Sequence, residues 1–490
     1  MATTTVRFTE EEIQSIFGHE AAEDEKPERL KSYYFKSAIY EKATAELGLR
    51  ILVGHKGIGK SALFTVAMQE ERDRGQLPIL IRPDDITGIG TDTGDFLKTI
   101  REWKHGLQEI IGRKTLDALG IHREGNVSAA LSSAGKFIAF LKDSLKPYVE
   151  AKVDLAPAQQ ALIANFLKNG TITVYVDDLD RGWEARKQDI ARISALLNAL
   201  RDLCNQNQGL RFKLSLRSDV YYLVRTSDES TDKIEGSVVW FTWTNHEILA
   251  LLAKRVETFF HRAVDEQMLL AMAQRDLAKY LAPVMEPFFA GQGKWVKAPI
   301  HRILMSLIRK RPRDLVKLCT LGAKKAHDAN RSKISTADFA DSFEEYSQGR
   351  VQDTINEFKS ELPDIERLLI NMKPNRIERR AALGYVYKTD ALLRKLQSIS
   401  EMGRFAFRNG TTADPKELAG FLYKINFLTA RKVLADGEID RKYFEENRYL
   451  SAKFADFGYD WEIHPAYRWA LQPDTVDQIY HQLELSADSK

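Results

Sequence analysis

The chain has 490 residues, of which 44% are hydrophobic and 29% charged. This composition is typical of folded globular proteins and excludes wholesale disorder. Lys and Arg number 72 against 69 Asp and Glu, a net charge of +3, which excludes nucleic-acid binding by overall charge but allows a local basic patch. The two cysteines, Cys204 and Cys319, form no CxxC pair, which excludes a zinc-finger or disulfide framework and favours a reducing compartment. At about 150 residues per domain, the length predicts about three domains.

Residues 1–32 are polar and mostly acidic, and we expect them to form a tether with one short amphipathic helix over Thr9 to Phe17. They contain no apolar stretch of the kind found in secretory signals. The most apolar runs of the chain, Leu49 to Gly54 and Ile172 to Val176, are far shorter than the ~20 residues of a membrane span. We therefore expect a soluble cytoplasmic protein without membrane contact.

Residues 33–264 alternate between short apolar strands and helices, a pattern that predicts an α/β domain with a mostly parallel sheet. Residues 88–170 interrupt this pattern and predict a helical insert, with helices over Phe96 to Ile111 and Ala129 to Leu145. The expected strands are Arg50 to Val53, Pro78 to Arg82, Ile172 to Val176, Phe212 to Leu216 and Val238 to Trp243.

After residue 265 the strand pattern disappears. Residues 265–350 predict a helical lid with a turn at Gly291-Gln292-Gly293, and residues 351–490 predict a winged-helix-like module. In that module we expect a helix over Leu418 to Val433, a hairpin within 454–463 and a terminal helix from Ala466 to Leu471. Such a module either binds DNA or packs against the rest of the chain, and the packing role is favoured.

The sharpest motif is the sequence GHKGIGKS at 54–61, which fits the phosphate-loop pattern G-x-x-x-x-G-K-[ST] at every fixed position. Glycines let successive N–H groups turn toward phosphate oxygens, and the following helix adds its positive end. Lys60 would reach the β- and γ-phosphates, and Ser61 would hold Mg²⁺. The predicted nucleotide-binding residues are Gly54, Lys56, Gly57, Ile58, Gly59, Lys60, Ser61 and Ala62.

A second acidic motif, DDLDR at 177–181, follows the apolar strand Ile172 to Val176. Because P-loop NTPases need a carboxylate at the end of a neighbouring strand, we expect Asp177 to hold Mg²⁺ together with Ser61. Asp178 stands where a water-polarising carboxylate is expected, and Asp180 is a third candidate. The division of roles among these aspartates stays open, and the alternative is a surface turn that caps the next helix.

These motifs, with the strand end Ser215-Leu216-Arg217-Ser218-Asp219 and the Trp243 start of a later helix, resemble the KAP/STAND-like P-loop ATPases of prokaryotes. The resemblance covers about residues 30–345. It implies ATP rather than GTP, Mg²⁺, and a homo-oligomer or a separate effector protein; many relatives are implicated in antiviral defence or signalling. The sequence also has no N-K-x-D base-reading motif in the expected place, which independently disfavours GTP.

The resemblance also implies roles for several polar residues. Ser215 would be a polar sensor, and Arg217 or Arg225 would sense or stabilise the γ-phosphate. In the lid, the segment Arg311-Pro312-Arg313-Asp314 is placed like a phosphate-sensing arginine, with Arg313 the first candidate and Arg311 the second. For each arginine, the alternative is a surface salt bridge.

Two stretches are strongly basic. Residues 301–333 contain ten Lys and Arg against two Asp, and residues 373–395 contain seven against two acids. Local charges of +8 and +5 suit a DNA partner, while the alternative for the first stretch is a solvated helix face plus a nucleotide sensor.

The preferred function is an ATP-binding and slowly ATP-hydrolysing conformational switch that gates assembly or a separate effector, with a role in bacterial anti-phage defence implied by the resemblance. The alternative is a DNA-engaging ATPase, a loader or translocase. No Ser-His-Asp, nuclease-like or HExxH motif is present, so we expect any destructive output to belong to a partner.

Overall fold

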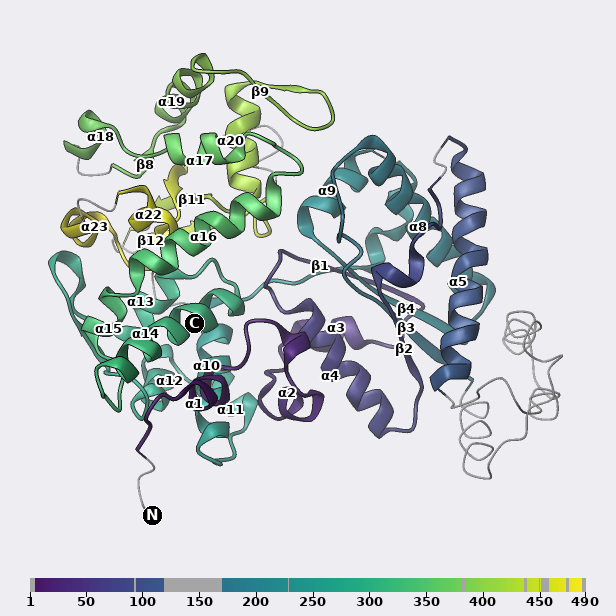
Figure 1. Ribbon diagram of the computed structural model, residues 1–490, viewed down its shortest axis with the longest axis horizontal. Helices are drawn as coiled ribbons and strands as arrows, with labels where there is room; N and C mark the ends of the chain where they lie inside the picture. The colour runs from purple at the N-terminus through teal and green to yellow at the C-terminus, as the bar shows by residue number, and fades with distance from the viewer. Residues whose placement is uncertain are drawn as a thin grey trace. The chain divides into compact units, whose positions relative to one another are not determined.

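The computed structural model describes residues 5–486 except 92–93, 119–169, 228, 381–383, 436–438, 449, 451–457 and 473–475. The chain divides into two compact units (Figure 1). We call Ser37–His55 together with Lys60–Phe241 the α/β unit. We call Met1–Lys36, Lys56–Gly59 and Thr242–Lys490 the helical unit. Each unit is therefore assembled from segments that are distant in the sequence.

The α/β unit is built on a parallel sheet whose described strands follow the order β2-β3-β4-β1-β5. All five strands predicted from the sequence are present, and the predicted α/β fold with a parallel sheet is confirmed. The strands are β1 (Leu49–Val53), β2 (Pro78–Ile81), β3 (Ile172–Val176), β4 (Leu210–Leu216) and β5 (Val238–Trp240).

Helices cover both faces of this sheet (Figure 1). On one face, Ile51, Val174 and Phe212 share a buried core with α5 and α8. On the other face, the Tyr175 ring meets Phe64 of α4 edge-on, and its hydroxyl donates to Glu71 at 3.0 Å. The helical elements are α3 (Ala38–Thr44), α4 (Lys60–Asp73), η2 (Pro83–Ile86), α5 (Phe96–Ala118), α8 (Lys187–Gln206), α9 (Ser218–Ser227) and η3 (Glu229–Ser237). The helix expected over Ala129 to Leu145 lies outside the described residues.

The helical unit begins with the N-terminal segment. α1 (Glu10–Phe17) packs against α10 and α14 and buries Ile13, Ile16 and Phe17, so the segment predicted as a tether contributes to a core. Two helix starts follow local rules: Thr244 caps α10 in a capping box with Glu247, and Pro312 occupies the first turn of α14. The further elements up to residue 358 are η1 (Ala22–Asp24), α2 (Pro27–Tyr33), α10 (Asn245–Phe259), α11 (Glu266–Ala271), α12 (Gln274–Leu277), η4 (Ala278–Leu281), η5 (Gly293–Trp295), α13 (Ile300–Leu307), α14 (Pro312–Asp328), α15 (Thr336–Ala340) and α16 (Phe343–Phe358).

The expectation that residues 265–350 form only helices is wrong at one place. The predicted Gly291–Gly293 turn joins two short antiparallel strands, β6 (Phe288–Ala290) and β7 (Val296–Pro299). Gly293 has φ +58 and lies against the backbone of Tyr480, so a Cβ there would approach the Tyr480 carbonyl oxygen to 2.7 Å. The turn therefore requires glycine, and it lets the flanking residues pair as a hairpin.

The C-terminal part combines helices with a four-stranded antiparallel sheet of order β12-β11-β13-β8. The predicted helix Leu418 to Val433 is only partly correct, because α20 ends at Lys424 and Leu428–Val433 form β11. Asn426, with φ +57, makes the left-handed turn between them. The elements are α17 (Ile365–Asn371), α18 (Arg376–Arg380), β8 (Val386–Tyr387), α19 (Thr389–Glu401), β9 (Phe405–Ala406), β10 (Thr412–Ala413), α20 (Pro415–Lys424), β11 (Leu428–Val433), β12 (Ile439–Lys442), β13 (Asp460–Ile463), η6 (Pro465–Tyr467), α22 (Arg468–Leu471) and α23 (Val476–Gln482).

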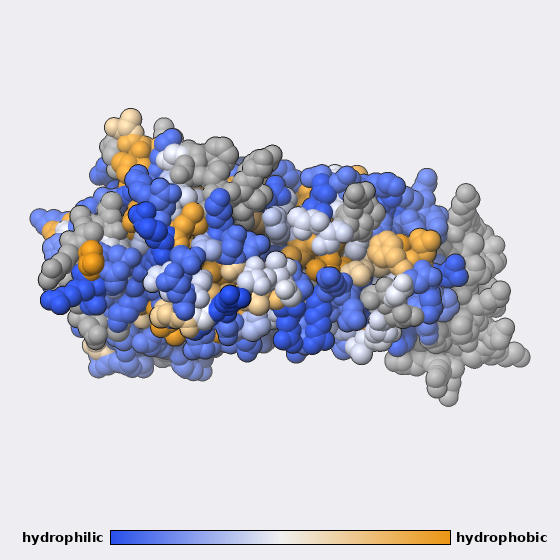
Figure 2. Space-filling view, turned by 90° about the horizontal axis from the view of Figure 1, so that it is seen from above, coloured by the Kyte–Doolittle hydropathy of each residue, from blue (hydrophilic) through white to orange (hydrophobic). Residues whose placement is uncertain are grey.

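The expected hairpin within 454–463 falls partly outside the described residues. Its described strand, β13, pairs with β11 and β8. The division of the C-terminal half at residues 265 and 351 stays a prediction. Among the described helices, none is both long and apolar enough to cross a bilayer. The face of the molecule shown in Figure 2 is mostly hydrophilic, with hydrophobic side chains in small groups.

Candidate nucleotide site

The phosphate loop connects β1 to α4, as the motif predicts. β1 lies between β4 and β5 in the sheet, and the Gly54 N–H donates to the Leu216 carbonyl at 3.1 Å. Gly57 and Gly59 have φ values of +79 and +106, which glycine adopts at low cost. The Lys60 ammonium donates to the Gly54 carbonyl at 2.8 Å and to the His55 carbonyl at 3.1 Å. Lys60 is thus held over the start of its own loop, where an anion would compete for its protons.

The predicted metal-binding carboxylate lies at the carboxyl end of a neighbouring strand. Asp177 follows β3, and its N–H donates to the Ile81 carbonyl of β2 at 3.1 Å. The Ser215 hydroxyl near the end of β4 donates to the Asp177 carboxylate, so the predicted sensor serine and the predicted metal ligand are in direct contact. The described residues contain no cluster of three or more His, Cys, Asp or Glu suited to a metal. A site with one carboxylate and the Ser61 hydroxyl suits Mg²⁺, which keeps waters and takes phosphate oxygens as ligands.

Asp178 and Asp180 differ in conformation and surroundings. Asp178 is exposed and has φ +59, a left-handed conformation that Asp tolerates better than most residues. Asp180 is partly buried and lies 3.5 Å from the Arg217 guanidinium. Burial raises the pKa of Asp180 above its usual range, while the charges of Arg217 and Lys60 oppose the rise. The two carboxylates at this strand end therefore differ in solvent exposure and in their contact with Arg217.

The predicted sensor arginines are engaged with carboxylates. Arg217 is buried and forms a two-pronged ion pair with Asp219, at 3.0 and 2.7 Å. Arg225 pairs with Asp232 at 2.7 Å and with Glu235 at 3.4 Å. Arg225 thus matches the salt-bridge alternative, whereas Arg217 also contacts Asp180 of the acidic motif.

Within the helical unit, residues 56–58 of the loop accept hydrogen bonds at three successive carbonyls. The Arg311 guanidinium donates to Lys56 O at 3.2 Å, and the Arg313 N–H donates to Gly57 O at 3.3 Å. The Trp243 indole N–H donates to Ile58 O at 2.8 Å. Of the two lid arginines predicted from the sequence, Arg311 contacts the loop through its side chain. The Arg313 guanidinium instead donates to the Glu20 carbonyl at 3.0 Å.

Two residues of the site have contacts that sequence reasoning missed. His55, inside the loop motif, is buried, and its Nδ1 lies 3.0 Å from the Ser218 hydroxyl. The Trp243 indole reaches the loop over a sequence distance of 185 residues. The motif marks His55 only as a variable position, and Trp243 stood out only as the start of a helix.

Most basic residues of the stretch 301–333 are engaged in polar contacts inside the helical unit. Arg309 and Asp314 form a buried pair at 2.7 Å that also includes Arg350. Eight of its ten basic residues have a polar partner among the described residues: Arg302 (Ser486 O), Arg309 (Asp314), Lys310 (Glu446), Arg311 (Lys56 O), Arg313 (Glu20 O), Lys317 (Glu20), Lys324 (Glu10) and Arg331 (Asp338). Most charges of the stretch are thus engaged within the helical unit, and the buried Arg309 and Arg311 also differ from the solvated helix face given as the alternative.

The second basic stretch is more open. Lys373, Arg376 and Arg394 are exposed, and Lys395 of α19 joins the segment by donating to Lys373 O at 3.0 Å and to Glu378 at 2.6 Å. In contrast, residues 418–424 of α20 are buried throughout. α20 therefore has no free face over these residues with which to enter a DNA groove.

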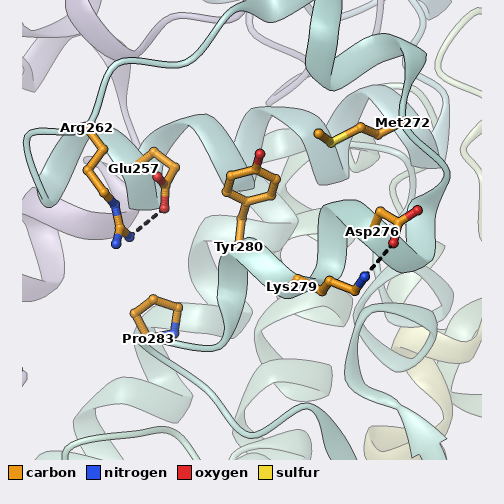
Figure 3. A pocket seen from close by; sticks show the side chains of 7 residues that line it. All are labelled: Glu257, Arg262, Met272, Asp276, Lys279, Tyr280 and Pro283. Carbon is orange, nitrogen blue, oxygen red and sulfur yellow. Dashed lines mark hydrogen bonds and ion pairs between the residues drawn. The ribbon is translucent and has the colours of Figure 1, made fainter.

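A separate cavity of about 560 Å³ lies in the helical unit (Figure 3). Its charged side chains form two ion pairs, Arg262 with Glu257 at 2.5 Å and Lys279 with Asp276 at 2.7 Å. Because these four charges already compensate one another, the cavity is a poor match for a highly charged nucleotide. The lining residues are Glu257, Arg262, Met272, Asp276, Lys279, Tyr280 and Pro283.

Comparisons with known proteins extend this description. Residues 247–355 match the family model of the FunZ-associated C-terminal helical domain. Over 539 aligned residues the chain is 23% identical to an Escherichia coli K12 protein named "Putative transposon gamma-delta 80.3 kDa protein", covering 96% of this chain and 70% of that protein.

Solved structures give weaker similarities. The Walker-type ATPase PABY2304 of Pyrococcus abyssi has a TM-score of 0.39 at 14% identity, covering 85% of this chain and 95% of that one. The ORC2 protein of Aeropyrum pernix, in ADPNP–ADP complexes, has a TM-score of 0.40 at 12% identity, covering 88% and 87%. The α/β fold of the chain follows from its parallel strands and from the loop between β1 and α4.

Proposed function

We propose that this chain binds ATP with Mg²⁺ and hydrolyses it. The observation that carries the proposal is the placement, in one α/β unit, of Lys60 and Ser61 after β1 and of Asp177 and Ser215 at the ends of β3 and β4. Lys60 would exchange the Gly54 and His55 carbonyls for phosphate oxygens, and Ser61 and Asp177 would hold the metal. Bound Mg²⁺ would neutralise charge on the phosphates.

Asp178 and Asp180 are the candidates for orienting the attacking water, and Arg217 or Arg313 for stabilising charge on the γ-phosphate. Since Arg217 lies between Asp180 and Asp219, it would act by holding Asp180 unless nucleotide binding releases it. The chemistry required is electrostatic positioning, because little covalent work falls to the protein in phosphoryl transfer.

The test of ATPase activity is Lys60→Ala. We expect loss of detectable hydrolysis and at least a tenfold weaker ATP affinity by calorimetry, about 1.4 kcal/mol or more. Lys187→Ala is the matched control, because Lys187 is an exposed lysine at the start of α8 in the same unit. If Lys60→Ala bound and hydrolysed ATP like the control, the proposed site would be wrong.

We further propose that hydrolysis drives a conformational switch that gates assembly or a separate effector. Two observations support this over DNA binding through the lid: the pairing of the 301–333 basic residues within the helical unit, and the burial of α20. Solution mass with ADP, with ATP and without nucleotide tests the switch. An unchanged mass, together with an unchanged protease-cleavage pattern, would contradict it.

A role in antiviral defence stays a prediction from the resemblance, since the comparisons do not address it.

The second candidate is a DNA-engaging ATPase, and two observations favour it. Lys373, Arg376 and Arg394 are exposed, and a relative is named for a transposon, which is a DNA element. Under this candidate, duplex DNA should raise ATP turnover, and Arg376→Glu with Arg394→Glu should weaken binding and lower its salt dependence. Lys325→Glu with Lys333→Glu is the control on the other stretch. Absence of DNA binding at ~100 mM salt would exclude this candidate.

A further inference from the structure

Three consecutive peptide groups of the phosphate loop are oriented by donors from the helical unit. The carbonyls of Lys56, Gly57 and Ile58 accept from Arg311, the Arg313 N–H and Trp243 respectively. Two of these donors are buried side chains, with exposed fractions of 2% for Arg311 and 4% for Trp243. The contacts therefore belong to the packed interior of the helical unit and are not surface encounters.

Because the peptide group is planar, the direction of each of these three carbonyls also sets the direction of the N–H group that follows it. In a planar trans peptide, the N–H of one residue points opposite to the carbonyl of the residue before it, and the described chain has no cis peptide. With the carbonyls of residues 56–58 directed at Arg311, Arg313 and Trp243, the N–H groups of Gly57, Ile58 and Gly59 point away from them. When successive N–H groups of a loop converge on one side, they form an anion-binding concavity.

We propose that Trp243 and Arg311 are positioning residues of the nucleotide site, which fix the loop so that these N–H groups face the phosphates. The proposal rests on the proposed ATP binding. Neither side chain needs to touch the nucleotide for this role. Each acts through a loop carbonyl, so its removal loosens the loop without removing any phosphate ligand.

The two positioning residues are themselves held in place. Trp243 directly precedes Thr244, whose capping box with Glu247 fixes the start of α10. Arg311 directly precedes α14 and lies 3.5 Å from Glu357 of α16. The start of α14 is fixed further by Asp314, which accepts from Arg309 at 2.7 Å. Trp243 and Arg311 each stand at the start of a helix that is fixed by such contacts. Their hydrogen-bond donors therefore have little freedom to move with the loop.

The test compares two tryptophans whose indole N–H groups donate to different carbonyls, one inside the phosphate loop and one away from it. Trp243→Phe removes the indole donor to Ile58 O while keeping a large ring. Trp295→Phe is the matched control, because the buried Trp295 indole donates to the Leu483 carbonyl at 3.1 Å in the same unit, away from the loop. Loss of one such hydrogen bond corresponds to about a fivefold change in an equilibrium constant.

We expect Trp243→Phe to weaken ATP binding about fivefold by calorimetry and to speed hydrogen exchange in the peptide covering 54–61 without nucleotide. Trp295→Phe should change neither, although both variants lower thermal stability. Arg311→Met should behave like Trp243→Phe, with partial recovery in Arg311→Lys, which keeps a donor. Wild-type protein that binds no ATP would overturn the proposed function and this proposal together. If wild type binds and Trp243→Phe matches it in affinity and loop exchange, only the positioning role is overturned.

Discussion

At the scale of single residues, Gly57 meets two requirements at once. Its φ of +79 is unfavourable for residues with a Cβ. A Cβ at this position would also lie 3.1 Å from Arg313 Cβ and 3.2 Å from Arg313 Cδ. Because Arg313 Cβ is fixed at the start of α14, the loop or the helix would have to shift.

Gly57→Ala is therefore expected to weaken ATP binding at least tenfold and to lower the free energy of unfolding by about 1–3 kcal/mol. Gly410→Ala is the control that introduces backbone strain without a steric contact. Gly410 has φ +89, and no atom lies within 4 Å of the position that a Cβ would take. That control should lose about 1–2 kcal/mol of stability and keep its affinity. Calorimetry and urea unfolding of both variants measure the two effects. Equal affinities would show that the contact with Arg313 does not matter for binding.

At the scale of elements, Glu462 joins parts of the C-terminal sheet to a following helix. On β13 it accepts from Arg441 of β12 at 2.6 Å and from Arg468 of α22 at 2.5 Å. Burial alone would raise the pKa of Glu462, but the charges of Arg441 and Arg468 outweigh it and lower the pKa to about 2. The buried Glu462 carboxylate thus balances the charges of both Arg441 and Arg468.

Glu462→Gln is expected to cost about 3–5 kcal/mol of stability at pH 7, because buried arginines lose their counter-charge. The folded pKa lies below the unfolded value near 4.5, so the carboxylate stabilises the fold fully above pH 4.5, and this contribution is lost as pH falls toward 2. The stability gap between wild type and variant should stay constant from pH 7 to about 5 and shrink below 4.5. Urea unfolding across this range measures it, with the exposed Glu401→Gln as control. A gap independent of pH down to 3 would contradict this assignment.

The elements also show what the sequence could and could not predict. The parallel strands were predictable because each is a short apolar run bounded by turns. Leu428–Val433 were predicted as helix because apolar residues recur from Leu418 through Leu428, and the single polar residues Lys424 and Asn426 do not by themselves end a helical pattern. The end of the helix depends on Asn426 in a left-handed conformation, a residue type that ends helices less clearly than glycine.

The same reasoning applies to the candidate site. Lys60, Ser61 and Asp177 were predictable because each stands at a fixed distance from a strand end, so local sequence determines its place. The contacts of Trp243 and Arg311 with the loop depend on how segments 185 and 255 residues apart pack together, and no local pattern encodes that. The engagement of Arg225 with Asp232 and Glu235 was likewise visible only in three dimensions.

At the scale of the whole molecule, the N-terminal segment is an integral part of the helical unit. Phe17 is fully buried, and its carbonyl accepts from Arg255 of α10. The acidic residues of the segment also pair with basic residues of α14, Glu20 with Lys317 at 2.9 Å and Glu10 with Lys324 at 3.5 Å. These pairs offset part of the positive charge of residues 301–333 within the same unit.

Phe17→Ala is expected to destabilise the helical unit by about 3–5 kcal/mol, the usual cost of deleting a buried ring. Met268→Ala is the control, because Met268 of α11 is 43% exposed and its removal should cost much less. Chemical unfolding followed by circular dichroism measures both. Equal stabilities would show that residues 10–17 act as the tether predicted from the sequence and not as part of the core.

The discontinuity of the helical unit has a consequence for synthesis on the ribosome. α1 is translated well before its packing partners α10 and α14, which begin at residues 245 and 312. At about 5–20 residues per second, Ile13, Ile16 and Phe17 wait roughly 10–60 s before they can be buried. The α/β unit, encoded between these segments, can fold during that interval. The apolar side chains of residues 10–17 therefore stay exposed while the α/β unit folds, and we expect chaperones that bind apolar segments to contact them during this interval.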